Sequence, residues 1–182
     1  GSGTDALYLS LRYLNLNKDD EVITVSNSYL STVSSIVLAG AKPVLVDVNY
    51  NDYNIDIHQI EKKITKKTKA IVPVHWAGKI CDMNQINRIS KKYSIPIVED
   101  ACHAILSKRF NKFAGNFGNM GCFSLHPLKN LNVWGDGGYI VVKNFQDYKK
   151  LSLMRNHGLI NRDKNLLFGY NSRLDTIQAV VA

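Results

Sequence analysis

The sequence predicts an α/β fold with a mostly parallel sheet between two layers of helices, and two observations carry this prediction. First, segments with the apolar spacing of helices alternate with short, strongly apolar segments. Second, the short segments are continuous apolar runs, such as Ala70-Ile71-Val72, which is typical of parallel strands covered on both faces. The chain of 182 residues, 45% of them hydrophobic, is long enough to bury a full core as one domain.

Local signals predict where the helices begin and end. Asp56 and Asp82 are predicted N-caps, because an aspartate side chain accepts hydrogen bonds from the first free amides of a helix. Gly40 is a predicted helix end, because glycine adopts the left-handed conformation that follows many helices. These signals and the apolar spacing predict helices over 4–15, 29–39, 56–64, 82–93 and 145–155, and a further helical run over 176–182.

Buried strands are predicted over residues 21–25, 43–48, 70–74 and 95–98. From residue 105 onward the alternation of helix and strand is less regular, and short strands are predicted around 122–124 and 139–142. The residues that interrupt this region are glycines: Gly115, Gly118, Gly121, Gly135, Gly137 and Gly138.

Composition excludes several classes of protein. No stretch reaches the roughly 18 apolar residues that span a bilayer, and no leader precedes a cleavage site. Cys81, Cys102 and Cys122 show no CxxC spacing, which argues against a disulfide framework and a zinc site and predicts a cytoplasmic protein without a metal. The net charge of +8 comes from lysines in short groups along predicted polar helix faces, and only this charge favours nucleic-acid binding.

Both ends of the chain suggest an internal piece of a longer protein. The chain opens on a glycine-rich turn with no strand before it, and it closes on an apolar helical run without a cap.

Candidate functional residues lie where the predicted strands end, because ligands of open α/β sheets bind beyond the carboxyl ends of the strands. Asp100 follows one such strand, and Lys129 lies in an uncharged, apolar stretch after another. We expect this stretch to desolvate Lys129 and so favour a neutral, nucleophilic amine, against the alternative of an ordinary exposed lysine.

The turn at residues 1–4, before the first helix, offers free amides and hydroxyls to a phosphate group. The alternative is that Ser2 or Thr4 only caps the helix. The glycine fingerprint of dinucleotide-binding proteins is absent, which weighs against a nicotinamide-dependent enzyme.

Seven segments, taken in order, make the sequence resemble one known family. They are Gly1-Ser2-Gly3-Thr4-Asp5-Ala6-Leu7, Pro73-Val74-His75, Glu99-Asp100-Ala101-Cys102-His103, Phe123 to Asn130, Gly135-Asp136-Gly137-Gly138, Arg155-Asn156-His157-Gly158 and Gly169 to Leu174. This set resembles the DegT/DnrJ/EryC1/StrS family of pyridoxal-phosphate-dependent aminotransferases of nucleotide-linked sugars. The resemblance implies that residues 1–182 are the pyridoxal-phosphate-binding large domain of a fold type I (aspartate aminotransferase-like) transferase, truncated at both ends and without its C-terminal small domain.

The resemblance also implies roles for individual residues. Lys129 corresponds to the lysine that forms the Schiff base with pyridoxal 5'-phosphate, and Asp100 to the aspartate that pairs with the pyridine nitrogen. The remaining cofactor contacts it implies are Ser124 with Ser2, Gly3 and Thr4 at the phosphate, Tyr29 against the pyridine face, His103 near the ring hydroxyl, and Asn171 at the phosphate of the neighbouring subunit in a homodimer.

The reaction that the resemblance implies moves an amino group from an amino acid, L-glutamate in the first instance, to a keto-sugar carried by a nucleotide diphosphate. A related branch has histidine in place of the lysine and dehydrates its sugar, so Lys129 favours transamination. Two alternatives stay open: a truncated, non-catalytic family member that acts as a binding module, and a pyridoxal-phosphate-dependent sugar dehydratase.

Overall fold

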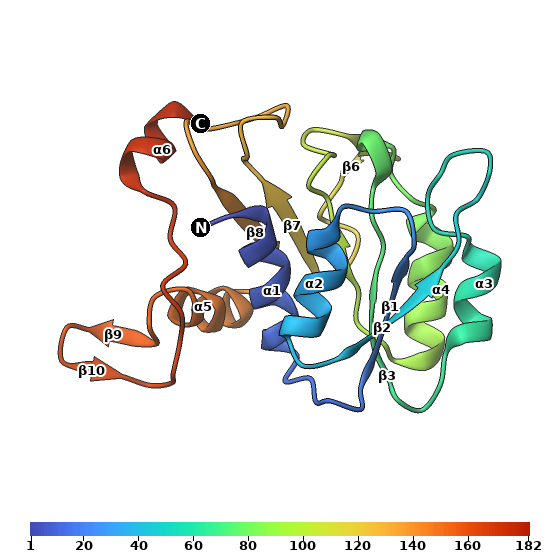
Figure 1. The fold of residues 1–182 in the computed structure, drawn as a ribbon, viewed down its shortest axis with the longest axis horizontal. Coiled ribbons are helices and arrows are strands. Elements are labelled where there is room, and N and C mark those ends of the chain that lie inside the picture. The colour runs from blue at the N-terminus through green and yellow to red at the C-terminus, as the bar shows by residue number, and fades with distance from the viewer.

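The computed structural model describes all 182 residues and has three layers, with a sheet between two sets of helices (Figure 1). Two three-stranded ladders, β2-β1-β3 and β4-β7-β8, are joined by parallel bridges from Ile71 to Ile97 and from Val74 to Asp100. The resulting strand order is β2-β1-β3-β4-β7-β8, in which only β8 runs antiparallel to its neighbour. The predicted mostly parallel α/β/α architecture is confirmed.

The helices are α1 (Gly3–Tyr13), α2 (Leu30–Leu38), α3 (Ile57–Lys63), α4 (Met83–Tyr93), α5 (Phe145–Met154) and α6 (Thr176–Val181), with one short 3-10 turn over Trp76–Gly78. The strands of the main sheet are β1 (Glu21–Val25), β2 (Lys42–Val46), β3 (Thr68–Val72), β4 (Val98–Asp100), β7 (Met120–Ser124) and β8 (Gly138–Val142). Two short hairpins are formed by β5 (Lys108–Arg109) with β6 (Lys112–Phe113), and by β9 (Leu159–Asn161) with β10 (Lys164–Asn165).

Side chains alternate along the central strands between two separate cores. In β1, Val22 packs with α1 and α2, whereas Ile23 packs with α3 and α4. In β3, Ala70 belongs to the core with α1 and α2, and Ile71 belongs to the core with α3 and α4. Because both faces of these strands are covered, apolar residues occupy consecutive positions in them, such as Ala70, Ile71 and Val72, which explains the continuous apolar runs in the sequence.

The predicted helix boundaries rest on capping contacts that the structure contains. The side chain of Asp56 accepts a hydrogen bond from the amide of His58, and Asp82 accepts one from the amide of Gln85. Gly40, after α2, has a φ of +97°, which glycine adopts without strain. The predicted caps and the predicted end of the second helix are therefore confirmed.

Two strand predictions are corrected. The segment 43–48 was expected to be a buried strand, but β2 lies at the edge of the sheet, and only Val46 among its residues is buried. The strand expected over 95–98 begins at Val98 and ends at Asp100. Pro96 has no amide to donate to a ladder, and the amide of Ile97 donates to the side chain of Asn119 instead of to a strand.

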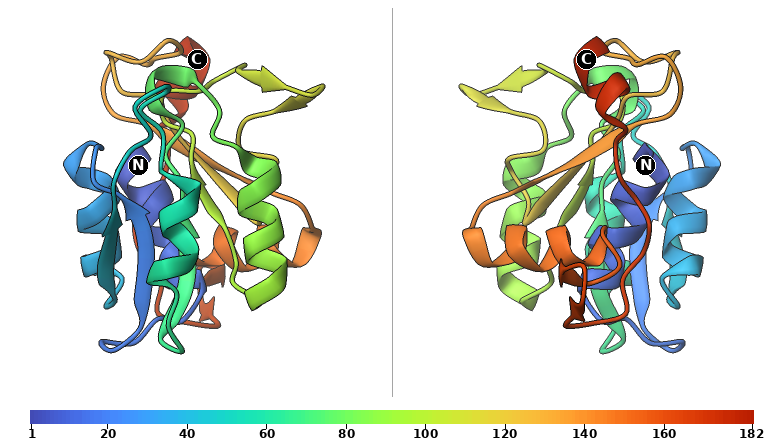
Figure 2. Two further views of the ribbon diagram at one scale, coloured as in Figure 1. Left: turned by 90° about the vertical axis from the view of Figure 1, so that its right-hand side faces the viewer. Right: turned by 90° about the vertical axis from the view of Figure 1, so that its left-hand side faces the viewer.

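The two hairpins were not predicted, because strands of two or three residues show no periodicity. The β5–β6 hairpin projects from the body of the molecule (Figure 2). Its turn uses Phe110 and Asn111, which both have positive φ. None of the helices combines the length and the apolar character needed to cross a membrane.

Candidate functional site

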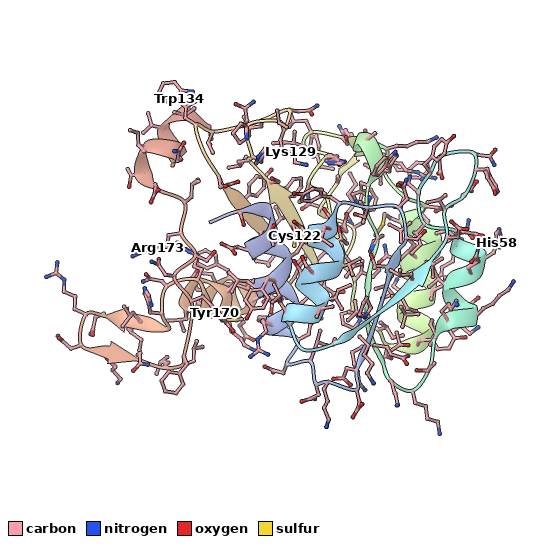
Figure 3. All side chains as sticks on the ribbon, in the orientation of Figure 1. His58, Cys122, Lys129, Trp134, Tyr170 and Arg173 are labelled. Carbon is pink, nitrogen blue, oxygen red and sulfur yellow. The ribbon has the colours of Figure 1, made fainter.

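A cavity of about 600 Å³ lies at the carboxyl ends of the parallel strands. The strand ends β4 and β7, the start of α1, the start of α2 and the loop after β7 all contribute to its wall. Lys129 lies in that loop, beyond the end of β7 (Figure 3). Eight of the nine residues predicted from the sequence line this one cavity: Ser2, Gly3, Thr4, Tyr29, Asp100, His103, Ser124 and Lys129.

Asp100 is the last residue of β4, and its side chain is 5% exposed. One carboxylate oxygen, Oδ2, accepts a hydrogen bond of 2.7 Å from the hydroxyl of Thr32, and the other, Oδ1, accepts one of 3.2 Å from the amide of Cys102. The two hydrogen bonds fix the orientation of this carboxylate at the floor of the cavity.

The start of α1 lies directly against the end of β7. A Cβ atom on Gly3 would lie 2.6 Å from Cβ of Ser124 and 3.0 Å from its Oγ, so only glycine allows this approach. Ser2 caps α1, with its hydroxyl accepting a hydrogen bond from the amide of Asp5. The capping role considered for Ser2 is confirmed. The first turn of α1 also has backbone amides without partners in the helix, and these amides lie at the positive end of the helix dipole.

Lys129 is half-buried, and its surroundings differ from those expected. Of the apolar residues around it in sequence, Leu128 is 88% exposed and Trp134 is 78% exposed, whereas Phe123, Leu125 and Val133 are buried. The stretch that was expected to desolvate Lys129 is therefore only partly buried.

Burial and charge set the protonation of two further residues in the cavity. Burial lowers the pKa of His103, the positive charge of Lys129 lowers it further, and the negative charge of Asp100 opposes both effects. His103 is therefore a neutral imidazole at pH 7. Burial, followed by the charge of Asp100, raises the pKa of Cys102 well above its usual value, so its side chain is a protonated thiol.

Tyr29 and Asn171 both present their side chains to solvent. Tyr29, at the N-cap of α2, is 72% exposed at the rim of the cavity, so it is not part of the apolar core. Asn171 is the one predicted site residue that does not line the cavity. It is exposed and pairs through its backbone with Asn156.

Sequence reasoning missed several residues of the cavity wall. Thr32 hydrogen-bonds to Asp100 across 68 residues of sequence, and no local pattern marks such a contact. Trp76 lies edge-on to His103, with ring centroids 6.0 Å apart. His126 accepts a hydrogen bond at Nδ1 from the amide of Leu128. Of these three residues, only His126 could have been chosen from the sequence, because it lies within a segment that resembles the known family.

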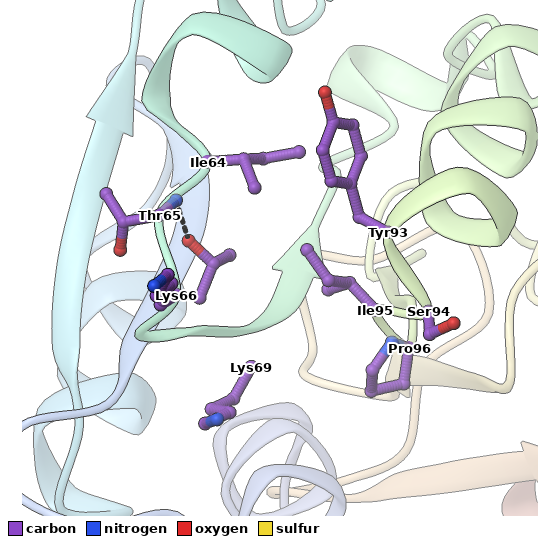
Figure 4. Close-up of a pocket in the computed structure, with 9 residues that line it drawn as sticks. Ile64, Thr65, Lys66, Lys69, Tyr93, Ser94, Ile95 and Pro96 are labelled. Atoms are coloured by element: carbon purple, nitrogen blue, oxygen red, sulfur yellow. Dashed lines mark hydrogen bonds between the residues drawn. The ribbon is translucent and has the colours of Figure 1, made fainter.

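A second hollow of about 660 Å³ lies at the opposite end of the sheet, where β3 and β4 begin (Figure 4). Its wall includes Lys66, Lys69 and Tyr93 but no carboxylate or imidazole. The amide of Thr65 donates to the hydroxyl of Thr68 there, at 2.9 Å. This hollow contains no set of residues typical of acid–base or nucleophilic catalysis.

The fold places the chain among the fold type I transferases, which use pyridoxal phosphate. It superposes on S. venezuelae DesV with a TM-score of 0.96 and 36% identity, over 100% of this chain and 49% of that chain. It superposes on NtdA from Bacillus subtilis, solved with bound cofactor PMP, with a TM-score of 0.93 and 37% identity, over 99% of this chain and 41% of that chain.

Within this class, the chain belongs to the DegT/DnrJ/EryC1/StrS aminotransferase family, whose family model matches residues 1–182. It is 42% identical to the UDP-N-acetyl-3-dehydro-alpha-D-glucosamine 3-aminotransferase of Acidithiobacillus ferrooxidans, over 99% of this chain and 49% of that protein. The chain spans about half the length of the curated relatives it matches.

Proposed function

We propose that residues 1–182 form the pyridoxal-phosphate-binding large domain of an aminotransferase that moves an amino group from L-glutamate to a keto-sugar of a nucleotide diphosphate. The observation that carries this proposal is the single cavity into which Asp100, Lys129, Ser124 and the start of α1 all project. Since the chain spans half of its relatives, the rest of the whole protein is expected to supply the small domain.

The start of α1 and the end of β7 fit the phosphate group of the cofactor. Amides of a helix start bind anions, because they lack partners and lie at the positive end of the helix dipole. Ser124 brings a hydroxyl next to Gly3. Any residue larger than glycine at position 3 would place a side chain in the space between them. Ser2 and Thr4 add two hydroxyls to the same wall of the cavity.

The carboxylate of Asp100 and the amine of Lys129 suit the reactive ring of the cofactor. When bound, pyridoxal phosphate supplies an electron sink that stabilises a carbanion beside the transferred nitrogen. Asp100, held at both oxygens, would hold a proton on the pyridine nitrogen. Lys129 would bind the cofactor covalently through Nζ and, once released, move a proton between the donor Cα and the cofactor. Tyr29 would pack against the face of the ring, and His103 would lie near the ring hydroxyl.

The substrate class rests on the relatives. The name of the Acidithiobacillus ferrooxidans relative gives a UDP-linked 3-dehydro sugar as its substrate, which supports a nucleotide-linked keto-sugar as the acceptor here. The structure of NtdA with PMP supports the aminated form of the cofactor as the carrier of nitrogen. The product would be an amino-deoxy sugar, for a surface polysaccharide or an antibiotic.

We further propose a homodimer with shared active sites. Asn171, which is exposed and outside its own chain's cavity, would reach the cofactor phosphate of the partner. Exposed apolar side chains surround this segment and α6: Phe168 is 96% exposed and Val180 is 81% exposed. A group of apolar side chains exposed to water favours a protein–protein interface at this surface. The three free cysteines suit a reducing, cytoplasmic compartment.

Reductive trapping tests the proposal in the full-length protein that carries this chain. After incubation with pyridoxal phosphate and reduction with borohydride, we expect peptide mapping to find one cofactor adduct, on Lys129. With nitrogen-labelled L-glutamate and the UDP-linked 3-keto sugar, we expect the label in the sugar. Absence of an adduct in a folded dimer would favour a non-catalytic binding module, and loss of water without incorporation of the label would identify a dehydratase.

Gly3→Ala is expected to weaken binding of pyridoxal phosphate by at least about tenfold, because the added methyl forces α1 and Ser124 apart. The measurement is the dissociation constant from absorbance titration of the apoenzyme. Gly40→Ala is the matched control: it strains a residue with positive φ far from the cavity, so it should lower stability and leave affinity unchanged. Equal affinities of Gly3→Ala and wild type would contradict the phosphate seat.

A further inference from the structure

Thr32 is buried, at 1% exposure, in the first turn of α2, and it connects that helix to the end of β4. Its hydroxyl donates a hydrogen bond to Asp100, at 2.7 Å from Oδ2. Neither residue is near the other in sequence, so this contact exists only because α2 packs beside the carboxyl ends of the strands. No role of Thr32 follows from the cofactor contacts described above.

The direction of the hydrogen bonds around Thr32 follows from chemistry. An ionised carboxylate only accepts hydrogen bonds, so the hydroxyl of Thr32 gives its one proton to Asp100. The hydroxyl of Ser28 lies 2.6 Å from that of Thr32, and it must then be the donor in this second contact. Ser28, Thr32 and Asp100 thus form a directed chain of donors that ends on the carboxylate.

The other groups around Asp100 do not replace this contact. The amide of Cys102 holds Oδ1 and leaves Oδ2 to Thr32. Lys129 and His103 face the same space from the loop after β7 and the segment after β4, and both are positioned to meet a ligand in the cavity. Without the Thr32 hydroxyl, Oδ2 of this nearly buried carboxylate would lose its donor, and the plane of the carboxylate would no longer be fixed from both sides.

We propose that Thr32 is a positioning residue that fixes the plane of the Asp100 carboxylate toward the cavity. This inference rests on the proposed function, in which Asp100 holds a proton on the pyridine nitrogen of the cofactor. Through Asp100, Thr32 tunes how strongly the ring withdraws electrons from the nitrogen of Lys129.

The test compares Thr32→Val, which removes the hydroxyl at nearly constant volume, with Thr32→Ser, which keeps it. The readout is the pH midpoint of the visible absorbance band of the cofactor bound to Lys129. A ring that holds its proton less tightly withdraws less electron density, so the Lys129 nitrogen keeps its own proton to higher pH. We expect Thr32→Val to raise the midpoint by at least about half a pH unit and Thr32→Ser to restore the wild-type value.

Ser34→Ala is the matched control, because Ser34 lies on the same helix and donates only to the backbone of Ser31. It should leave the midpoint unchanged. An unchanged midpoint in Thr32→Val, or an equal shift in Thr32→Ser, would overturn the inference. If Thr32→Val does not fold, Ser28→Ala takes its place, with a smaller upward shift expected and an unchanged midpoint as the overturning result.

Reductive trapping on the same samples separates this inference from the proposed function. An adduct on Lys129 in wild type and in Thr32→Val, with identical midpoints, refutes only the role of Thr32. Absence of an adduct in wild type refutes the proposed function itself.

Discussion

Replacing Lys129 by methionine is expected to abolish the covalent cofactor adduct and to lower transamination by at least about 10³-fold, within the range that a general acid–base group supplies. Methionine keeps the length of the side chain but has no amine to bind the cofactor or to carry a proton. The measurements are single-turnover rates with L-glutamate and peptide mapping after reduction by borohydride.

Lys143→Met is the control for this experiment. Partial burial lowers the pKa of Lys143, and its amine donates to the carbonyl of Phe117. By amine chemistry alone Lys143 would be a better nucleophile than an ordinary surface lysine, but it does not line the cavity. We expect Lys143→Met to keep both the adduct and the rate. An adduct that disappears in Lys143→Met and persists in Lys129→Met would refute the assignment of Lys129.

Replacing Glu99 by alanine is expected to have the largest effect on stability. Glu99 is completely buried beside Asp100 in β4, and its carboxylate accepts hydrogen bonds from the amides of Gly115 and Gly118 and from Nε2 of His75. Nδ1 of His75 accepts a hydrogen bond from the amide of Cys81, so the proton of the imidazole lies on Nε2. Without the carboxylate, three buried donors lose their acceptor.

We expect Glu99→Ala to lower the free energy of unfolding by at least about 3 kcal/mol, since buried unpaired donors are costly. That is a large share of the roughly 5–15 kcal/mol typical of a folded domain. Glu99→Gln keeps the volume and one acceptor oxygen, so its loss should be smaller. The measurement is urea-induced unfolding followed by circular dichroism.

Glu61→Gln provides the surface control. Glu61 forms an exposed ion pair with Lys92 on the helices α3 and α4, at 2.8 Å. Exposed pairs contribute little, so its unfolding curve should match that of wild type. A Glu99→Ala curve that also matches wild type would show that the buried network does not stabilise β4.

Local sequence signals were enough to predict the helices and strands whose boundaries depend on their own residues. Asp56 and Asp82 cap their helices with side chains two or three residues from the amides they bind. The continuous apolar run of β3 follows from burial on both faces. For the site, the resemblance selected nine residues, of which the fold brings eight to one cavity.

Predictions that depended on neighbours in space were less accurate. Leu128 and Trp134, which lie near Lys129 in sequence, are exposed to solvent, and β2 lies at an edge that its composition does not reveal. The strand after Pro96 starts late, because a distant asparagine, Asn119, takes the amide of Ile97.

The sequence by itself determined the α/β alternation, the helix caps and the choice of candidate site residues, because each depends on residues close along the chain or on ordered motifs. Only the tertiary structure decided what surrounds those residues. Thr32 reaches Asp100 across 68 residues of sequence, and Gly3, near the start of the chain, meets Ser124 at the end of β7. The physical reason is that hydrogen bonds and van der Waals contacts act over a few ångströms in space, whereas periodicity records only which face of its own element a residue occupies.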